Sequence, residues 1–273
     1  MGTSLNSALF FLLNDFFLTR IFANKSSYMK LLILAIGVHP DDVELSCSGT
    51  LINEIKKGRS AGIVDLTAGE LGTRGTAETR FTEAKLAAEI MGLSVRENLG
   101  MRDGFFRNDE EHQLKVIKAI RKYQPEVVLA NVLDDRHPDH GRAGKLVSES
   151  CFLAGLSKIE TIGDDGQAQK RWRPKQVFHY IQDRFYEPNI VIDITDVFEQ
   201  RMDAIKAYAT QFHASPDGAK GVQTYISTPD FLEALISRSR LLGKRIGVKY
   251  GEGFLTQKNI GIRTFDDIIL NET

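Results

Sequence analysis

The chain has 273 residues, of which 42% are hydrophobic and 26% are charged. These values are typical of a globular protein with a full core and exclude a disordered or fibrous one. The formal net charge of -1 offers no basic surface for nucleic acid, so a small-molecule partner is expected. Cys47 and Cys151 are too few for a disulfide framework and lack thiolate zinc spacing, which favours a cytoplasmic location.

Residues 1–28 differ in composition from the rest of the chain. They contain the apolar stretch 8–22, which Asp15 interrupts and which no basic residue precedes. This composition fits neither a secretory signal nor a membrane span, so no membrane association is expected. We therefore expect residues 1–28 to be an N-terminal extension outside the catalytic core, and residues 29–273 to form a single domain.

Strands and helices alternate along the first half of the chain. Residues 31–38 form the unbroken apolar run expected of a parallel strand covered on both faces. A helix over 42–57 should end at Gly58 before a second strand at 61–66. The alternation continues with two helices and a strand, at about 79–91, 109–123 and 127–132. The pattern predicts an α/β, Rossmann-like fold, with a mostly parallel sheet, helices on both faces and an active site at the carboxyl ends of the strands.

The second half of the chain should complete the same sheet. Short strands are predicted near 177–181 and 190–194. Long helices are predicted at about 196–212 and 230–244, separated by a loop at 213–228 that contains Gly, Ser and Pro. No linker in this half is polar enough to indicate a second domain.

The segment His39-Pro40-Asp41-Asp42 stands where the first strand ends and its helix begins. A strand end projects adjacent side chains into the crevice, so His39 and Asp42 can meet one ion while Asp41 stays free. The same residues also suit a simple helix start, with Asp42 as the cap and Asp41 at the positive helix end. Taken alone, the segment favours capping.

A second segment, Arg-His-Pro-Asp-His at 136–140, directly follows the strand at 127–132. Two strands that both end in His-Pro-Asp are better explained by a metal centre than by two ordinary polar loops. Two histidines and one carboxylate leave room on an ion for a water or a substrate oxygen. The sequence therefore predicts that His39, Asp42 and His140 bind one divalent ion, Zn2+ or another such as Fe2+.

The remaining residues of the two segments suit amide hydrolysis. Zinc brings the pKa of a bound water down to about 7, so that a carboxylate need only take the proton. Asp41 adjoins the ligand set without being needed in it, which predicts a general base. A protonated His137 would stabilise the oxyanion, and Asp139 would orient that ring or raise its pKa.

Both segments resemble the zinc-dependent N-acetylglucosaminyl deacetylases, the family that includes the phosphatidylinositol-glycan and mycothiol-pathway deacetylases. In that family His-Pro-Asp-Asp supplies a ligand His, a base Asp and a ligand Asp in that order. The likeness extends from about Met29 almost to the C-terminus. It is closest to the bacillithiol biosynthesis branch through four blocks, DLTAGEL at 65–71, DRHPDHG at 135–141, QF at 211–212 and YGEGF at 250–254.

The resemblance implies deacetylation of an N-acetylglucosamine conjugate, here N-acetylglucosaminyl malate, giving acetate and a free amine. It assigns Arg74 and Arg80 to the sugar or the malate carboxylates, Asp103 to sugar hydroxyls and Tyr225 to the region of the acyl group. Purely structural roles also fit two of these residues, because Arg80 suits a surface ion pair and Asp103 suits a turn. The resemblance further implies a homo-oligomer, a trimer or hexamer.

Other functions fit the sequence less well. Another small N-acetyl sugar is the alternative substrate. A non-haem iron oxygenase also uses two histidines and a carboxylate, but it needs no extra acid such as Asp41. A non-catalytic sugar-binding protein would not need Asp41 either. A dinucleotide enzyme would require a glycine pattern that the turn at 37–42 lacks.

Overall fold

The computed structural model describes residues 29–212 and 222–270. The extension expected at 1–28 and most of the loop expected at 213–228 lie outside the described residues. Within the two described ranges, none of the helices combines the length and the apolar character that crossing a bilayer requires.

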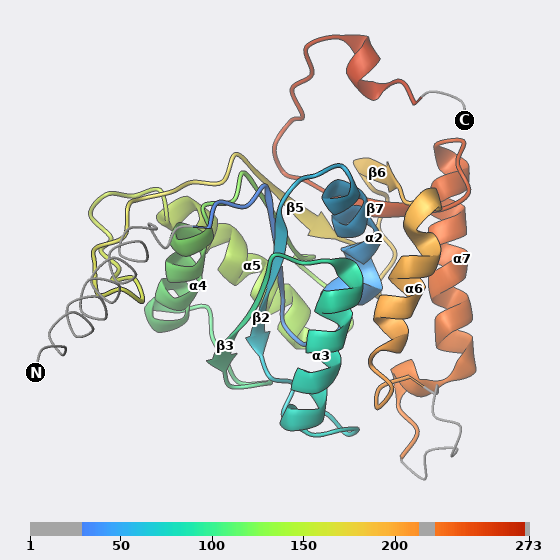
Figure 1. The fold of residues 1–273 in the computed structure, drawn as a ribbon, viewed down its shortest axis with the longest axis horizontal. Helices are drawn as coiled ribbons and strands as arrows, with labels where there is room; N and C mark the ends of the chain where they lie inside the picture. The colour runs from blue at the N-terminus through green and yellow to red at the C-terminus, as the bar shows by residue number, and fades with distance from the viewer. Residues whose placement is uncertain (1–28, 213–221, 271–273) are drawn as a thin grey trace, which may run out of the picture.

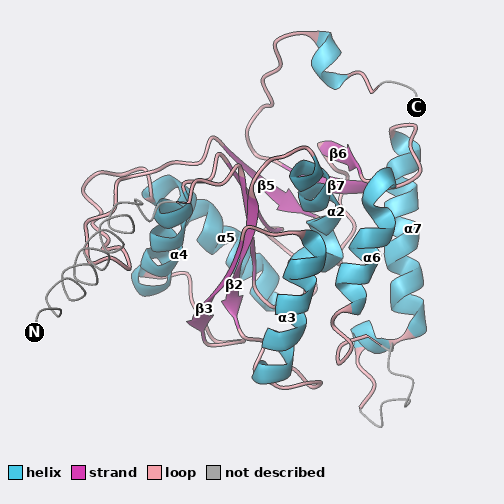
Figure 2. Ribbon diagram, in the orientation of Figure 1, coloured by secondary structure: helices cyan, strands magenta, loops and turns pink. Residues whose placement is uncertain are grey.

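In the described residues, seven strands form one sheet in the order β3-β2-β1-β4-β5-β7-β6. Figure 2 shows strands in magenta with helices around them. Strands β1 to β5 are mutually parallel, and β7 runs antiparallel to both β5 and β6. Their bounds are β1 (Ile33–Gly37), β2 (Ala61–Thr67), β3 (Val95–Met101), β4 (Val127–Asn131), β5 (Gln176–Tyr180), β6 (Ile190–Asp193) and β7 (Gly251–Leu255). The predicted α/β, Rossmann-like fold with a mostly parallel sheet is confirmed.

Helices cover both faces of the sheet (Figure 1). One face carries α2 (Asp42–Lys56), α3 (Ala77–Met91), α6 (Phe198–Lys206) and α7 (Pro229–Arg245), and the other carries α4 (Glu110–Tyr123) and α5 (Pro138–Leu153). The described part of the chain also contains the short 3-10 helices η1 (Thr195–Val197), η2 (Tyr225–Ser227) and η3 (Phe265–Ile268).

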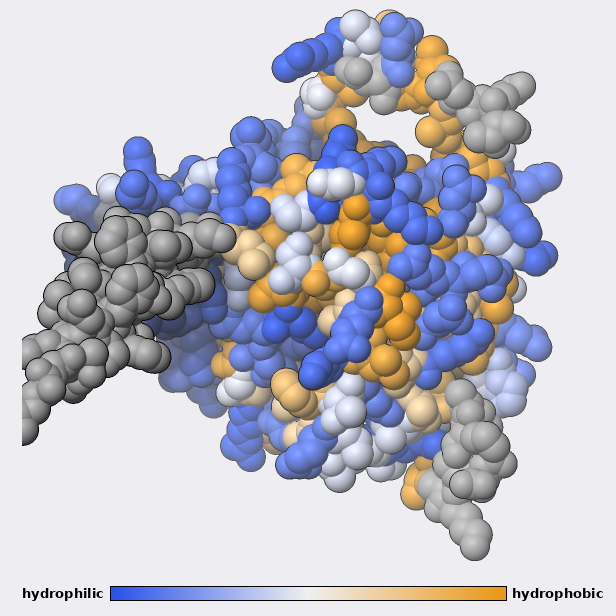
Figure 3. All heavy atoms as spheres, in the orientation of Figure 1, coloured by the Kyte–Doolittle hydropathy of each residue, from blue (hydrophilic) through white to orange (hydrophobic). Residues whose placement is uncertain are grey.

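Strand β1 contributes to two hydrophobic cores at once. Ile33 and Ala35 pack with α2, α3 and α6, whereas Leu34 and Ile36 pack with α4 and α5. Because alternate side chains point to opposite faces, a central strand covered on both sides must be apolar throughout. In Figure 3, hydrophobic side chains gather near the middle of the visible face and hydrophilic ones surround them.

The structure differs from the predicted elements in four places. Strand β3 was not predicted because it is an edge strand that carries Arg96, Glu97 and Asn98 instead of an apolar run. Helix α5 and strand β7 were not predicted either. Helix α6 was expected to reach residue 212 but ends at Lys206. The apolar residues beyond it, including Tyr208 and Phe212, are buried in the core although they lie outside any helix.

The strand order of the sheet reverses between β1 and β4. From β1 the chain continues to β2 on one side, whereas β4 lies on the other side and leads to β5. In open parallel sheets a crevice forms at this point, beyond the carboxyl ends of the strands. The loops that follow β1 and β4 therefore face each other across the crevice.

Candidate metal centre and active site

Two loops meet beyond the carboxyl ends of β1 and β4. The first carries His39, Asp41 and Asp42, and α2 begins at Asp42. The second carries His137, which caps α5, and His140, which lies in the first turn of that helix. Since β1 and β4 are paired along their length, the two loops bring their polar side chains together.

His39, Asp42 and His140 form a compact donor set. Each offers one ligand atom, and these atoms lie within 4.8 Å of one another. Nε2 of His140 is 3.3 Å from Oδ1 of Asp42, and Nδ1 of His39 is 3.7 Å from Oδ2 of Asp42. Two imidazole nitrogens and one carboxylate at this spacing fit a divalent ion with an open position.

A second carboxylate binds the outer nitrogen of each imidazole. Nε2 of His39 is 2.9 Å from Oδ1 of Asp103, and Nδ1 of His140 is 2.7 Å from Oδ2 of Asp135. Such acids fix the tautomer and the ring orientation of a metal-binding histidine. Burial lowers the pKa of His39, but hydrogen bonds to Asp103 and Asp42 outweigh it and raise the pKa to about 10. The surroundings thus favour positive charge where an ion would bind.

Asp42 is held by four further donors. Its Oδ2 accepts hydrogen bonds from the backbone N–H groups of Val38 (3.0 Å) and His39 (3.1 Å) and from the side chain of Asn131 (3.2 Å). Its Oδ1 accepts one from Nε2 of Gln182 (2.6 Å). Burial would raise the pKa of Asp42, but the charges and hydrogen bonds of His140 and His39 hold it well below its usual range. The carboxylate is therefore ionised.

Asp41 lies beside the donor set in a strained backbone conformation. Its φ of 132° is rare for a residue other than glycine. The side chain is 7% exposed, and its Oδ2 is 3.9 Å from Nη1 of Arg80. Burial raises the pKa of Asp41 to about 7, and the charge of Arg80 opposes that shift. A carboxyl group with these properties suits proton transfer near neutral pH.

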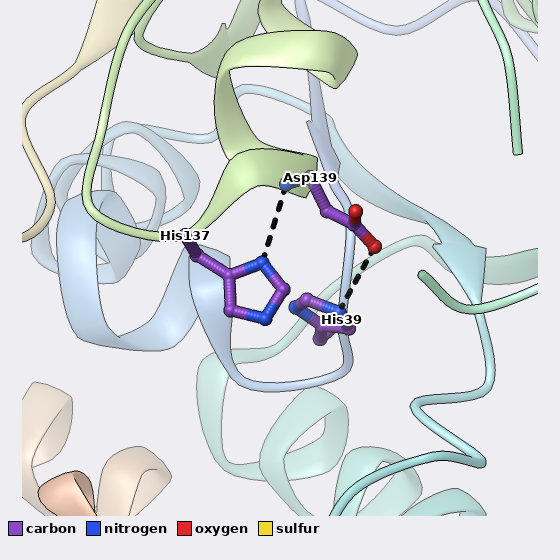
Figure 4. A group of neighbouring side chains, drawn as sticks. All are labelled: His39, His137 and Asp139. Carbon is purple, nitrogen blue, oxygen red and sulfur yellow. Dashed lines mark hydrogen bonds and ion pairs between the residues drawn. The ribbon is translucent and has the colours of Figure 1, made fainter. Parts of the chain in front are cut away.

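His137 and Asp139 face His39 from the start of α5 (Figure 4). The backbone N–H of Asp139 donates to Nδ1 of His137 (3.3 Å), which leaves the ring proton on Nε2. Burial and the neighbouring histidines lower the pKa of His137. Protonation of His137 is therefore unnecessary, because the neutral ring already donates through Nε2. The charge of Asp139 opposes the shift in the pKa of His137, as expected, and its carboxylate accepts hydrogen bonds from the N–H of Gly104 (2.8 Å) and from Nη1 of Arg142 (2.7 Å).

A second group of ligand atoms, from His39, His137 and Asp139, also lies within 4.8 Å. It shares His39 with the donor set. Nε2 of His39 is 3.9 Å from Oδ2 of Asp139 (Figure 4), but this nitrogen already bonds to Asp103 at 2.9 Å. The set that includes Asp42 and His140 is therefore the better metal site.

A cavity of about 270 Å³ opens over the donor set. His39, Asp41 and His137 line it from the strand ends, and Tyr225 and Arg238 line it from the C-terminal part of the chain. A larger cavity of about 990 Å³ lies between α3 and β3 and contains none of the metal donors. The smaller cavity is therefore the candidate substrate pocket.

Known proteins resemble this chain in sequence and in fold. A family model described as PIG-L, GlcNAc-PI de-N-acetylase, matches residues 34–151, which include both His-Pro-Asp segments. The uncharacterized deacetylase YaiS of Escherichia coli is 33% identical over 160 residues, covering 56% of this chain and 84% of YaiS. The structure of the conserved protein TT1542 from Thermus thermophilus has a TM-score of 0.74 and 35% identity, covering 85% of this chain and 97% of that one. The chain belongs to the PIG-L family.

Relatives of this PIG-L protein carry several named activities. The structure of an N,N'-diacetylchitobiose deacetylase from Pyrococcus horikoshii has a TM-score of 0.69 at 25% identity, covering 98% of this chain and 99% of that one. A Bacillus anthracis protein described as a probable N-acetyl-alpha-D-glucosaminyl L-malate deacetylase is 22% identical over 193 residues, covering 66% of this chain and 81% of that protein. A 4-oxalmesaconate hydratase of Pseudomonas putida is 27% identical over 195 residues, covering 66% of this chain and 74% of the hydratase. The likeness supports the PIG-L family but does not single out the bacillithiol branch.

The two arginines predicted to contact substrate are held by other parts of the PIG-L protein. Arg74 is not among the lining residues of the substrate cavity, and its Nε donates to the carbonyl of Thr210 (2.8 Å). Arg80 lines the cavity, but its Nη2 donates to Oε1 of Gln211 (2.5 Å) and its Nη1 faces Asp41. The structure therefore places Arg80 behind the candidate base.

The other two predicted substrate residues both line the cavity. Asp103 has both oxygens engaged, one with His39 and one with the backbone N–H of Leu71 (3.0 Å). Tyr225 is 54% exposed, and its hydroxyl donates to Oδ1 of Asp183 (2.9 Å). The structure thus connects Asp103 to the metal donors and leaves Tyr225 at the rim.

Sequence reasoning missed three residues of this site, Asp135, Gln182 and Arg238. Asp135 stands directly before the second segment, and Gln182 follows the end of β5. Both positions at strand ends were a usable signal, because polar residues there face the crevice. Arg238 lies in the middle of α7, where no sequence feature distinguishes it from a surface arginine.

Proposed function

We propose that this chain is a metal-dependent hydrolase that removes the acetyl group from the nitrogen of an N-acetylglucosamine conjugate, with residues 29–273 as its catalytic domain. The observation that carries this proposal is the donor set of His39, Asp42 and His140 in a member of the PIG-L family, with Asp41 beside it. We propose Zn2+ as the ion, with Fe2+ as the alternative, since both bind two histidines and a carboxylate.

The residues around the donor set have separate roles in amide hydrolysis. A divalent ion there supplies Lewis-acid activation of water and of the acetamide oxygen. Asp41 takes a proton from the attacking water and returns it to the departing nitrogen. Nε2 of His137 donates a hydrogen bond to the acyl oxygen as negative charge develops on it. The carbon–nitrogen bond breaks, and acetate and a free amine are the products.

Within this class we propose N-acetylglucosaminyl malate as the first conjugate to test. The four sequence blocks that resemble the bacillithiol branch support this choice, as does the Bacillus anthracis relative. Another small N-acetyl sugar is the alternative, supported by the relative that acts on diacetylchitobiose. The homo-oligomer stays a prediction of the same resemblance.

The test measures acetate and free amine released from N-acetylglucosaminyl malate and diacetylchitobiose by the metal-loaded protein. Asp41→Asn should keep the ion but lower kcat by about 100-fold or more, because it removes the base. His140→Ala should lose both the ion and turnover. Asp134→Asn is the matched control, since Asp134 lies in the same loop with 69% of its side chain exposed.

Two results would count against the proposal. Normal turnover of Asp41→Asn at saturating substrate would remove Asp41 from the role of base. No acetate from either conjugate would contradict the deacetylase itself. Parallel incubation with 4-oxalmesaconate, followed by absorbance, would then test the reaction named for the Pseudomonas putida relative.

A further inference from the structure

We propose that Arg238 binds an anionic group, a carboxylate or a phosphate, on the part of the substrate that lies away from the acetamide. The inference rests on the proposed deacetylase function and narrows it to conjugates that carry a negative charge. It assigns a specificity role to a residue of α7, which is remote in sequence from both His-Pro-Asp segments.

The first support is the charge balance of the substrate cavity. Three arginines line it, Arg80, Arg136 and Arg238. Arg80 lies 3.9 Å from Asp41, and Arg136 pairs with Asp183. Among the residues that the structure describes, no carboxylate oxygen lies within the 4.0 Å ion-pair distance of Arg238. Arg238 is therefore the cavity arginine whose charge the described part of the chain leaves unpaired.

The second support is the number of donors that Arg238 leaves unused. A guanidinium carries five N–H donors, and among the described residues Arg238 makes one hydrogen bond, from Nη2 to the carbonyl of Leu45 (3.2 Å). That carbonyl already accepts a shorter hydrogen bond from Nη2 of Arg201 (2.8 Å). Arg238 is therefore not needed to satisfy Leu45, and its remaining donors are available at the cavity wall.

The third support is that apolar side chains line the cavity together with Arg238. Leu45, Ile226 and Phe231 line the same cavity. Burial, with the charge of Arg201, lowers the pKa of Arg238 to about 10, and the charges of Glu252, Asp183 and Asp135 oppose the shift. A cation in such surroundings is costly unless a counter-charge arrives. A carboxylate or phosphate can accept two parallel hydrogen bonds from a guanidinium and would supply that charge.

The position of Arg238 indicates which part of the substrate it would contact. The metal donors lie at the ends of β1 and β4, whereas Arg238 enters the same cavity from α7. A ligand whose acetamide faces His39, Asp42 and His140 therefore presents another part of itself to α7. In a small glucosaminide, that part includes the group attached to the sugar.

The experiment compares three probes that differ in one group, namely methyl N-acetyl-glucosaminide, carboxymethyl N-acetyl-glucosaminide and N-acetylglucosamine 1-phosphate. The metal-loaded wild-type protein should prefer a charged probe to the methyl glycoside by about 10-fold or more in kcat/KM. Arg238→Gln should bring that ratio close to one through a higher KM for the charged probe. The carboxymethyl and phosphate probes show which anion is preferred.

Two further variants make the result interpretable. Arg240→Gln is the matched control, because Arg240 lies on the exposed side of the same helix and outside the cavity lining, and it should keep the wild-type ratio. Arg238→Lys should keep part of the preference, since it retains a point charge without the planar fork. It also tests the idea if Arg238→Gln does not fold.

An unchanged ratio in Arg238→Gln, or no wild-type preference for either charged probe, would overturn the proposal. Failure of the deacetylase function would look different, because none of the probes would then release acetate. In that case calorimetric binding of the same three probes to the metal-loaded protein would decide on Arg238. Tighter wild-type binding of a charged probe, lost in Arg238→Gln, would support it, and equal binding would refute it.

Discussion

Two acids outside the donor set control how the histidines present their nitrogens. With Asp103 on Nε2 of His39 and Asp135 on Nδ1 of His140, the nitrogens that face Asp42 are Nδ1 and Nε2 respectively. A neutral imidazole has one N–H and one lone pair, so an acid on the outer nitrogen leaves the lone pair inward. Metal affinity should therefore depend on residues that do not contact the ion.

Asp135→Ala should weaken metal binding by about 10- to 100-fold, because Nδ1 of His140 loses its acceptor. Asp135→Asn should have a smaller effect, since its amide oxygen still accepts the same N–H. The measurements are competition with a chelator and the visible spectrum of the Co2+-loaded protein. Asp134→Ala, one residue away and exposed, should bind like wild type. Equal affinity of Asp135→Ala and wild type would show that Asp135 does not position the ring.

Individual residues were predictable from the sequence only where a motif stood next to an apolar strand. His39, Asp42 and His140 met that condition. Asp135 and Gln182 stand at strand ends but belong to neither His-Pro-Asp motif, so their contacts with His140 and Asp42 were not predicted. Arg238 lies in a helix about 200 residues after the first segment, and its presence in the cavity follows from tertiary packing alone.

Helix α2, which begins with Asp42, is broken at Cys47, where φ is -148° and ψ is 16°. Beyond the break, the backbone N–H groups of Gly49 and Thr50 donate to the carboxylate of Glu252 in β7 (2.9 and 2.7 Å). Glu252 also pairs with Nε of Arg201 in α6 at 2.9 Å. The second half of α2 is thus capped by an acid that lies 203 residues from Gly49 in sequence. The extent of this helix was predictable, but the break was not.

Glu252→Gln should lower the free energy of unfolding by about 3 kcal/mol or more, because it leaves the buried charge of Arg201 without its partner. The measurement is equilibrium unfolding in urea. Glu54→Gln is the matched control on the same helix, since Glu54 pairs with the exposed Arg59, and such a pair contributes about 0–1 kcal/mol. Similar losses in the two variants would mean that Glu252 does not cap the broken helix.

The residues of the candidate site come from three distant parts of the chain. Alternating strands and helices were enough to predict the fold and the crevice, because the β1 and β4 runs are apolar and long. Strand β3 is too charged to show this pattern, and β7 has two glycines in five residues. Yet β7 supplies Glu252, and α7 returns along the sheet to supply Arg238. The C-terminal third therefore shapes a site whose motifs lie before residue 141.

An ion bound by His39, Asp42 and His140 would join loops that lie about 100 residues apart in sequence. These three ligands come together only in the folded chain. The ion should therefore stabilise the folded state, by about 2.7 kcal/mol at a free ion concentration 100-fold above Kd. The expected result is a Tm increase of about 5–10 °C that a chelator reverses. Asp41→Asn should show the same increase, which would separate binding from catalysis. His140→Ala should show none, because two donors remain. A full increase in His140→Ala would instead place the ion elsewhere, for example at His39, His137 and Asp139.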